Sequence, residues 1–173
     1  MGPRSSSTEI KTLILIRHAH RHKTLGAHVD NGLSAKGKRQ ARRIAAYYRR
    51  SHGREQPVCL SSPKLRCIET LSPLARVSGV QVEISPLLDE MGSKESSRHF
   101  RQRLVEFERW WRDLAPPLVV ICTHGDWIPE ALALMTGAPI DLKKGGWAEL
   151  QWDGGEIRLT WLIQDLSSVT EKI

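Results

Sequence analysis

Apolar runs and amphipathic segments alternate along this chain. Residues 13–16 and residues 118–122 are two leucine-, isoleucine- and valine-rich runs without polar alternation. Runs of this kind and length are typical of strands that are buried on both faces of a parallel sheet. The other expected strands are shorter or carry polar positions, and they cover residues 58–60, 80–84, 147–152 and 157–161.

The segments between these strands have the apolar spacing of amphipathic helices. The first helix is expected to open at residues 33–37, with Ser34 as its N-cap, and to end at Gly53. The second follows Pro63, which suits a first helical position, and contains Pro73, which favours a kink. This second helix, at 64–77, is expected to bury Leu65, Ile68, Leu71, Leu74 and Ala75; two more helices are expected at 98–114 and 127–135, after an irregular stretch at 85–97.

This alternation of strands and helices predicts an α/β fold. We expect a three-layer sandwich, in which helices flank a mostly parallel central sheet. Asp153-Gly154-Gly155 separates the last two strands, which indicates a hairpin and therefore an antiparallel edge near the C-terminus. A chain of 173 residues is most simply one domain. We expect that domain at residues 11–165, between a disordered leader at 1–10 and a polar tail at 166–173.

Composition and cysteine usage indicate a cytoplasmic globular protein. No apolar run reaches the roughly 20 residues of a membrane span, and the N-terminal segment lacks the apolar core of a secretory signal. Cys59, Cys67 and Cys122 have neither disulfide-framework nor zinc spacing, and they adjoin apolar segments, so buried free thiols are expected. The formal charge of +7 predicts attraction to anions, whether nucleic acids, phosphoesters or acidic proteins.

Basic and imidazole side chains follow the expected strands. Arg17 and His18 follow the first apolar run, Arg66 lies shortly after the strand at 58–60, and His124 follows the run at 118–122. The carboxyl ends of parallel strands meet at one rim, where ligands bind. Two arginines and two histidines at that rim, beside a helix N-terminus, suit the oxygens of a phosphate. No H-x-x-H pair or carboxylate cluster has metal-ligand spacing, so neither a metal nor another cofactor is expected.

Five motifs follow one another in the chain. They are the strand ending in Arg-His at 15–19, L-S-x-x-G-x-x-Q-A at 33–41, S-x-P-x-x-R-x-x-x-T at 61–70, L-x-E at 88–90, and the strand ending in His-Gly at 120–125. In this order they resemble the histidine phosphatase superfamily, which includes the phosphoglycerate mutases. The resemblance implies that His18 is a nucleophile that forms a phosphohistidine. It also implies that Arg17, Arg66 and His124 hold the phosphoryl group, and that Glu90 protonates the leaving group and then activates water.

The chain departs from these motifs directly after the first histidine. Ala19 stands where the family has glycine, which leaves the backbone less freedom. Arg21 matches the place of a third phosphate-binding arginine in the acid-phosphatase branch, and His20 is expected at the rim of the pocket. Because that branch takes its acid from beside the second histidine, Asp126 competes with Glu90 as the general acid.

The short chain leaves little room for segments that cap the site. In size it is closest to the small bacterial phosphohistidine phosphatases, so the resemblance implies an open site and a phosphorylated protein as substrate. A broad-specificity phosphatase for small molecules or nucleotides is the alternative enzyme, and a non-catalytic phosphate- or nucleic-acid-binding domain is a further one. No nucleic-acid motif is present, so neither a nucleic acid nor a membrane is expected as partner. The oligomeric state stays open.

Overall fold

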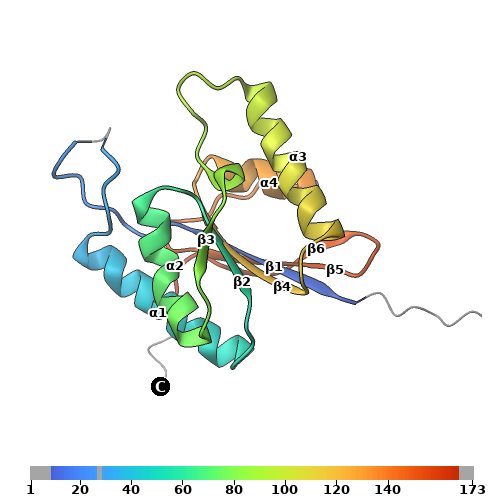
Figure 1. Ribbon diagram of the computed structural model, residues 1–173, viewed down its shortest axis with the longest axis horizontal. Coiled ribbons are helices and arrows are strands. Elements are labelled where there is room, and N and C mark those ends of the chain that lie inside the picture. Colours follow the sequence, from blue (N-terminus) through green and yellow to red (C-terminus); the bar gives the residue numbers. More distant parts are fainter. Residues whose placement is uncertain (1–8, 27–28, 168–173) are drawn as a thin grey trace, which may run out of the picture.

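One six-stranded mixed sheet with helices on both faces forms the molecule (Figure 1). The computed structural model describes residues 9–26 and 29–167. The strands are β1 (Lys11–Arg17), β2 (Val58–Ser61), β3 (Val82–Ile84), β4 (Leu118–Thr123), β5 (Trp147–Trp152) and β6 (Ile157–Ile163). The helices are α1 (Ala35–His52), α2 (Leu65–Ser78), α3 (Ser97–Asp113), α4 (Trp127–Thr136) and the 3₁₀ turn η1 (Pro86–Leu88).

The strand order is β3-β2-β4-β1-β5-β6. The first four of these strands pair in parallel, whereas β5 is antiparallel to both β1 and β6. This arrangement confirms the α/β fold and the antiparallel hairpin near the C-terminus. In the register, Arg17 lies opposite Thr123, and Ser61 lies opposite Cys122. The residues that follow β1, β2 and β4 therefore meet at one rim of the sheet.

The sheet divides the core into two layers. Leu13 and Leu15 of β1 pack in the cluster with α3 and α4, whereas Ile14 and Ile16 pack in the cluster with α1 and α2. All four side chains are fully buried. Strand β1 is thus buried on both faces, as its unbroken apolar sequence predicts, and the three-layer sandwich is confirmed.

Helix α2 differs most from its predicted form. It begins at Leu65 rather than at residue 64, with Lys64 as its N-cap, and the carboxylate of Asp30 accepts the Leu65 N–H from outside the helix. Leu65 is exposed and Ile68 is half-buried, so the prediction that both belong to the core is wrong. The helix buries a stripe shifted by one residue, which includes polar side chains, because it packs on the sheet next to the site: Arg66, Cys67, Thr70, Leu71, Leu74, Ala75 and Ser78.

Smaller differences occur at the ends of elements. β3 begins at Val82 instead of residue 80, because the Val80 N–H closes the end of α2 on the Ala75 carbonyl. Leu166, the first residue of the expected polar tail, is buried in the core. The leader at 1–8 and the tail at 168–173 lie outside the described residues. The three cysteines are free and buried, as expected. Of the helices described here, none is long and apolar enough to span a bilayer.

Candidate active site

A pocket of about 290 Å³ opens at the rim where β1, β2 and β4 end. All six residues that the sequence proposed for the site line it: Arg17, His18, Arg21, Arg66, Glu90 and His124. Gly125, Asp126 and Lys144 complete the wall. The pocket therefore joins residues that are separated by more than a hundred positions in the chain.

His18 is held as a neutral imidazole with one ring nitrogen available. Its Nδ1 lies 2.9 Å from the carbonyl oxygen of Ala19, so the proton belongs on Nδ1 and the lone pair on Nε2. Burial first, and then the nearby cations Arg66 and Arg17, lower the pKa of His18 to about 4 against the opposing effect of the Ala19 hydrogen bond. A neutral ring with a free Nε2 is what a nitrogen nucleophile requires at neutral pH.

His124 faces His18 across the pocket, with the two ring centroids 5.4 Å apart. The Nη2 of Arg66 lies 3.2 Å from Nδ1 of His124, and a guanidinium only donates, so Nδ1 accepts and Nε2 carries the proton. That proton is donated to Oγ of Ser62 at 2.7 Å, and Ser62 donates in turn to Asp89 at 3.3 Å. Burial, followed by the charge of Arg66, lowers the pKa of His124 to about 2.

Arg66 is the buried cation at the centre of the site. Its Nη2 donates to Oε2 of Glu90 at 2.6 Å, and its Nη1 lies 3.6 Å from Asp30. Its Nε has no hydrogen-bond partner among the described residues. Because the Leu65 N–H is already bound by Asp30, the side chain of Arg66 is the group of this helix start that offers donors to an anion.

Both candidate acids lie at the pocket, in different surroundings. Oε2 of Glu90 lies 3.7 Å from Nδ1 of the neutral His124 and binds Arg66, so it faces that buried cation directly. Oδ2 of Asp126 accepts the backbone N–H of Met91 at 2.8 Å, which fastens that carboxylate to the neighbouring loop. Of the two candidate acids, Glu90 is therefore the carboxylate that contacts the buried Arg66 guanidinium.

The guanidinium of Arg17 occupies the space that a side chain at Gly125, directly after His124, would need. Its Nη1 donates to the carbonyl of Leu142 at 2.7 Å, while its buried Nε has no partner among the described residues. A Cβ at Gly125 would lie only 2.5 Å from Cζ of Arg17. The absence of a side chain at Gly125 thus lets the guanidinium lie flat against the chain after β4. The sequence assigned no role to Gly125, although its His-Gly motif was the available signal.

The substitution of alanine for glycine at residue 19 is accommodated. No residue other than glycine has a positive φ in the described chain, so position 19 does not need glycine's freedom. The side chain of Ala19 is buried, and its N–H donates to Oγ1 of Thr70 at 2.9 Å. The Thr70 hydroxyl donates onward to the Arg66 carbonyl. Thr70 therefore ties the loop after His18 to α2.

Motif residues of α1 hold the next part of this loop. Oε1 of Gln40 accepts the His20 N–H, and its Nε2 donates to the Lys144 carbonyl at 2.9 Å. Arg21 forms an isolated antiparallel bridge with Leu33, and its side chain reaches the pocket. His20 lies beside the pocket wall without lining the pocket itself.

Lys144 is the lining cation that the sequence did not indicate. It lies in the loop before β5, outside all five motifs, so no pattern in the chain pointed to it. Burial lowers its pKa, and the surrounding cations Lys23 and Arg17 lower it further. Such crowding of like charges favours a bound anion.

Arg103 of α3 fastens the loop that carries Glu90. It donates to the carbonyls of Leu87, Asp89 and Glu90 and pairs with Glu95. The hydrogen bond from Arg103 holds the pKa of Glu95 at about 2. The loop that carries Glu90 is therefore attached to α3, and none of the described residues that line the pocket belongs to that helix.

No group of three or more His, Cys, Asp or Glu side chains within residues 9–26 and 29–167 is arranged to hold a metal ion.

The sequence of residues 13–93 matches the family model described as histidine phosphatase superfamily (branch 1). No curated protein sequence matches the chain. Among solved structures, the α-ribazole phosphatase of Shigella flexneri is similar with a TM-score of 0.75 and 18% identity, over 90% of this chain and 96% of that one. A mycobacterial glucosyl-3-phosphoglycerate phosphatase gives a TM-score of 0.64 and 20% identity, over 87% of this chain and 97% of that one.

A third similar structure is a mutant phosphoserine phosphatase of Entamoeba histolytica in complex with phosphoserine. Its TM-score is 0.68 at 16% identity, over 91% of this chain and 98% of that one. At these identities the three likenesses establish the shared fold.

Proposed function

We propose that this chain, whose residues 13–93 match the histidine phosphatase superfamily model, hydrolyses a phosphomonoester or phosphoramidate through a phosphohistidine on His18. The observation that carries the proposal is the neutral His18 ring, whose Nε2 is free while Arg17, Arg66 and His124 line the same pocket. The guanidinium groups of Arg17 and Arg66 can bind the phosphoryl oxygens and stabilise the charge that spreads over them during transfer, and His124 can join them when its Nε2–H is released from Ser62.

The reaction takes place in two steps. In the first, Nε2 of His18 bonds to phosphorus, the bond from phosphorus to the leaving group breaks, and Glu90 gives that group a proton. In the second, Glu90 takes a proton from water, whose oxygen bonds to phosphorus as the N–P bond breaks. Arg66 binds Glu90 in the ligand-free site. Phosphoryl oxygens compete for that guanidinium, which releases the carboxyl group for proton transfer.

Loss of the nucleophile tests this proposal first. With p-nitrophenyl phosphate and no added metal, we expect His18→Ala to lower kcat by at least about a thousandfold, because no other group replaces Nε2 in forming the N–P bond. Normal turnover by His18→Ala would exclude the phosphohistidine. If that variant binds phosphate but the wild type hydrolyses no phosphate compound, the non-catalytic binding domain is the better description.

The identity of the acid is tested with a matched pair of carboxylate variants. With an alkyl phosphate, whose leaving group needs protonation, we expect Glu90→Gln to lower kcat by about 10²–10⁴-fold. Asp126→Asn should lose less than tenfold, because it keeps a group that can accept the Met91 N–H. With p-nitrophenyl phosphate, whose leaving group needs no protonation, both variants should lose less activity in the step that forms the phosphohistidine. The reverse order of the two variants would assign proton transfer to Asp126.

For the substrate, we propose a phosphorylated protein, in particular one phosphorylated on histidine. The stretch between β3 and α3 is only twelve residues long, from 85 to 96, and its ordered element is the single turn η1. A short stretch there leaves the pocket open to a large partner. The free, buried cysteines agree with a cytoplasmic place for such a reaction.

A small phosphoester is the second candidate, and the comparisons favour it, since similar structures include phosphatases of α-ribazole phosphate and of glucosyl-3-phosphoglycerate type. A substrate panel separates the two. We expect a phosphorylated histidine phosphotransfer domain to have a higher kcat/KM than sugar phosphates, nucleotides and p-nitrophenyl phosphate. If small esters react much faster, the protein substrate is excluded.

A further inference from the structure

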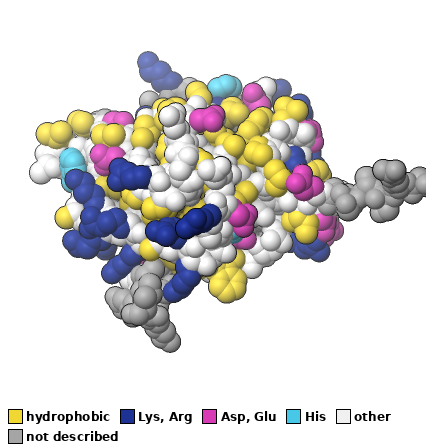
Figure 2. Space-filling model, turned by 60° about the horizontal axis from the view of Figure 1, so that its bottom comes forward, with side chains coloured by type: hydrophobic (Ala, Val, Ile, Leu, Met, Phe, Trp, Pro, Cys, Tyr) yellow, Lys and Arg dark blue, Asp and Glu magenta, His cyan; other side chains and the backbone are white. Residues whose placement is uncertain are grey.

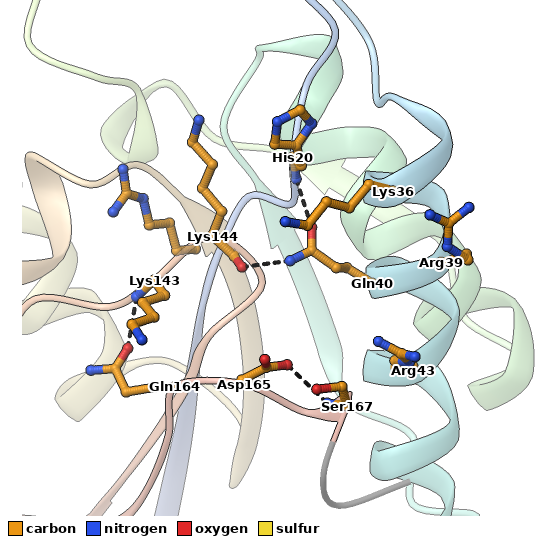
Figure 3. Close-up of a pocket in the computed structure, with 11 residues that line it drawn as sticks. His20, Lys36, Arg39, Gln40, Arg43, Lys143, Lys144, Gln164, Asp165 and Ser167 are labelled. Atoms are coloured by element: carbon orange, nitrogen blue, oxygen red, sulfur yellow. Dashed lines mark hydrogen bonds between the residues drawn. The ribbon is translucent and has the colours of Figure 1, made fainter. Parts of the chain in front are cut away.

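A second hollow adjoins the active site. It has a volume of about 690 Å³ and lies between α1 and the loop that precedes β5, with residues after β6 at its far side (Figure 3). We call it the side pocket. Its cations are Lys36, Arg39 and Arg43 from α1, Lys143 and Lys144 from the loop, and Arg17 from β1.

The charge of the side pocket is strongly unbalanced. Six of the eleven described residues that line it are Lys or Arg, and Asp165 is the single carboxylate among these eleven. In the described part of the chain, no carboxylate forms an ion pair with Lys36, Arg39 or Lys144. Figure 2 shows Lys and Arg side chains gathered on the side of the molecule that carries α1. This surface therefore has positive charge that the described chain leaves uncompensated.

The position of Lys36 adds to this imbalance. It lies in the first turn of α1, a turn without an acidic residue. The N-terminal end of a helix carries a partial positive charge, so a lysine there is mildly unfavourable for the helix itself. Both the helix end and the Lys36 ammonium attract an anion at the mouth of the side pocket. The local sequence thus favours ligand binding over helix stability.

The side pocket and the catalytic pocket share a wall. Arg17 and Lys144 line both of them. Gln40 fixes this wall, because it accepts the His20 N–H and donates to the Lys144 carbonyl (Figure 3). A molecule whose phosphate lies at His18 can therefore extend past Arg17 and Lys144 and enter the side pocket.

We propose that the side pocket binds a second anionic group of the substrate, so that the enzyme prefers substrates with further negative charge beside the phosphate that is removed. This proposal rests on the proposed function of the catalytic pocket. None of the described lining residues has an aliphatic side chain or is Phe, Tyr or Trp, which suits a hydrated charged group rather than a ring or an acyl chain. A second phosphoryl group on a small molecule and a run of carboxylates on a phosphoprotein share this chemistry.

Two matched substrate pairs test the proposal and identify the source of the anion. The first pair is fructose 1-phosphate and fructose 1,6-bisphosphate, with release of the 1-phosphate measured. The second is a phosphohistidine peptide flanked by glutamates and the same peptide flanked by glutamines. We expect the more acidic member of at least one pair to have a kcat/KM about tenfold higher or more, mainly through KM.

Helix α1 offers matched variants for this measurement. Lys36→Ala/Arg39→Ala removes two charges from the side pocket, whereas Lys38→Ala/Arg42→Ala removes two from the same helix at a separate hollow beside α2. We expect the first variant to abolish the preference and the second to keep it. Both should hydrolyse p-nitrophenyl phosphate within about twofold of the wild type, because none of the four residues lines the catalytic pocket. Lys36→Gln/Arg39→Gln repeats the first change with longer side chains.

The outcomes separate this proposal from the proposed function. A preference in the sugar pair that depends on Lys36 and Arg39 assigns the side pocket to a second phosphoryl group, and one in the peptide pair assigns it to carboxylates. If neither pair shows a preference, or if the preference survives in Lys36→Ala/Arg39→Ala, the second-anion site is excluded while phosphatase activity stands. Full activity of His18→Ala on p-nitrophenyl phosphate would instead exclude the proposed function.

Discussion

The two buried histidines owe their neutral state to their surroundings. Both lie at the end of an apolar strand, and both are surrounded by cations that repel a further positive charge. Because burial lowers the pKa of His18 to about 4, the ring stays unprotonated throughout the range from pH 7 to pH 5. An exposed histidine, with a pKa near 6.5, would become largely protonated over the same range.

The pH profile of kcat/KM tests this state of His18. For p-nitrophenyl phosphate, corrected for the ionisation of the substrate itself, we expect no loss between pH 7 and pH 5 that follows a pKa near 6.5. kcat/KM is the right quantity, because it reports the groups of the free enzyme. A drop with a pKa near 6.5 that remains after this correction would show that the nucleophile is protonated like an exposed imidazole.

The position of the Arg17 guanidinium depends on the absence of a side chain at Gly125. A Cβ at this position would lie 2.5 Å from Cζ of Arg17, so Gly125→Ala must move the guanidinium away from the pocket wall. We expect kcat/KM to fall about 10- to 100-fold, the scale of losing one charged phosphate contact. In the double variant Gly125→Ala/Arg17→Ala the loss should be no larger than in Arg17→Ala alone. Additive losses would show that Gly125 acts by another route.

At the scale of elements, α2 contributes Arg66 to the pocket because the buried face of this helix includes polar side chains. Thr70 on this face accepts the Ala19 N–H and donates to the Arg66 carbonyl, so it joins the loop after His18 to the helix that carries Arg66. In Thr70→Val the shape is kept, but the buried Ala19 N–H loses its acceptor. We expect a loss of about 1–3 kcal/mol in the free energy of unfolding, together with a lower kcat.

Ser72 provides the control for this prediction. It lies on the same helix and donates to the carbonyl four residues earlier, as Thr70 does, but it forms no hydrogen bond with the described residues of the loop after His18. Ser72→Ala should change the unfolding free energy by less than about 0.5 kcal/mol and leave kcat unchanged. Similar losses of kcat in Ser72→Ala and Thr70→Val would show that the hydroxyl acts on the helix rather than on the loop.

The sequence predicts those parts of this protein that depend on neighbouring residues in the chain, and it does not predict those that depend on tertiary packing. Unbroken apolar runs locate β1 and β4, and the N-cap Ser34 locates the start of α1, because these signals are local. Apolar periodicity does not locate the buried face of α2, because this face includes Arg66 and Thr70, whose polar groups are bound by partners around the pocket. Lys144 reaches the site only through the packing of its loop, for which the sequence contains no local signal.

For the whole molecule, the two histidines couple folding to pH. In the unfolded chain both imidazoles bind a proton below about pH 6.5, whereas in the folded chain His18 binds one only near pH 4 and His124 near pH 2. The unfolded state therefore binds more protons in between, and stability is lost as the pH falls from 6.5 towards 4. For His18 alone the loss is about 3 kcal/mol by the linkage relation.

Urea unfolding at a series of pH values measures this coupling. We expect the free energy of unfolding to decrease from pH 6.5 to pH 4, and to decrease less steeply in His18→Asn and His124→Asn, which each remove one of the two imidazoles. Glu95 contributes in the same direction only below the pKa of an ordinary glutamate, because its own pKa in the folded chain is about 2. The part of the slope between pH 6.5 and pH 5 therefore belongs to the histidines. If that part is equally steep in both asparagine variants, the buried imidazoles of the site do not set the acid stability of the fold.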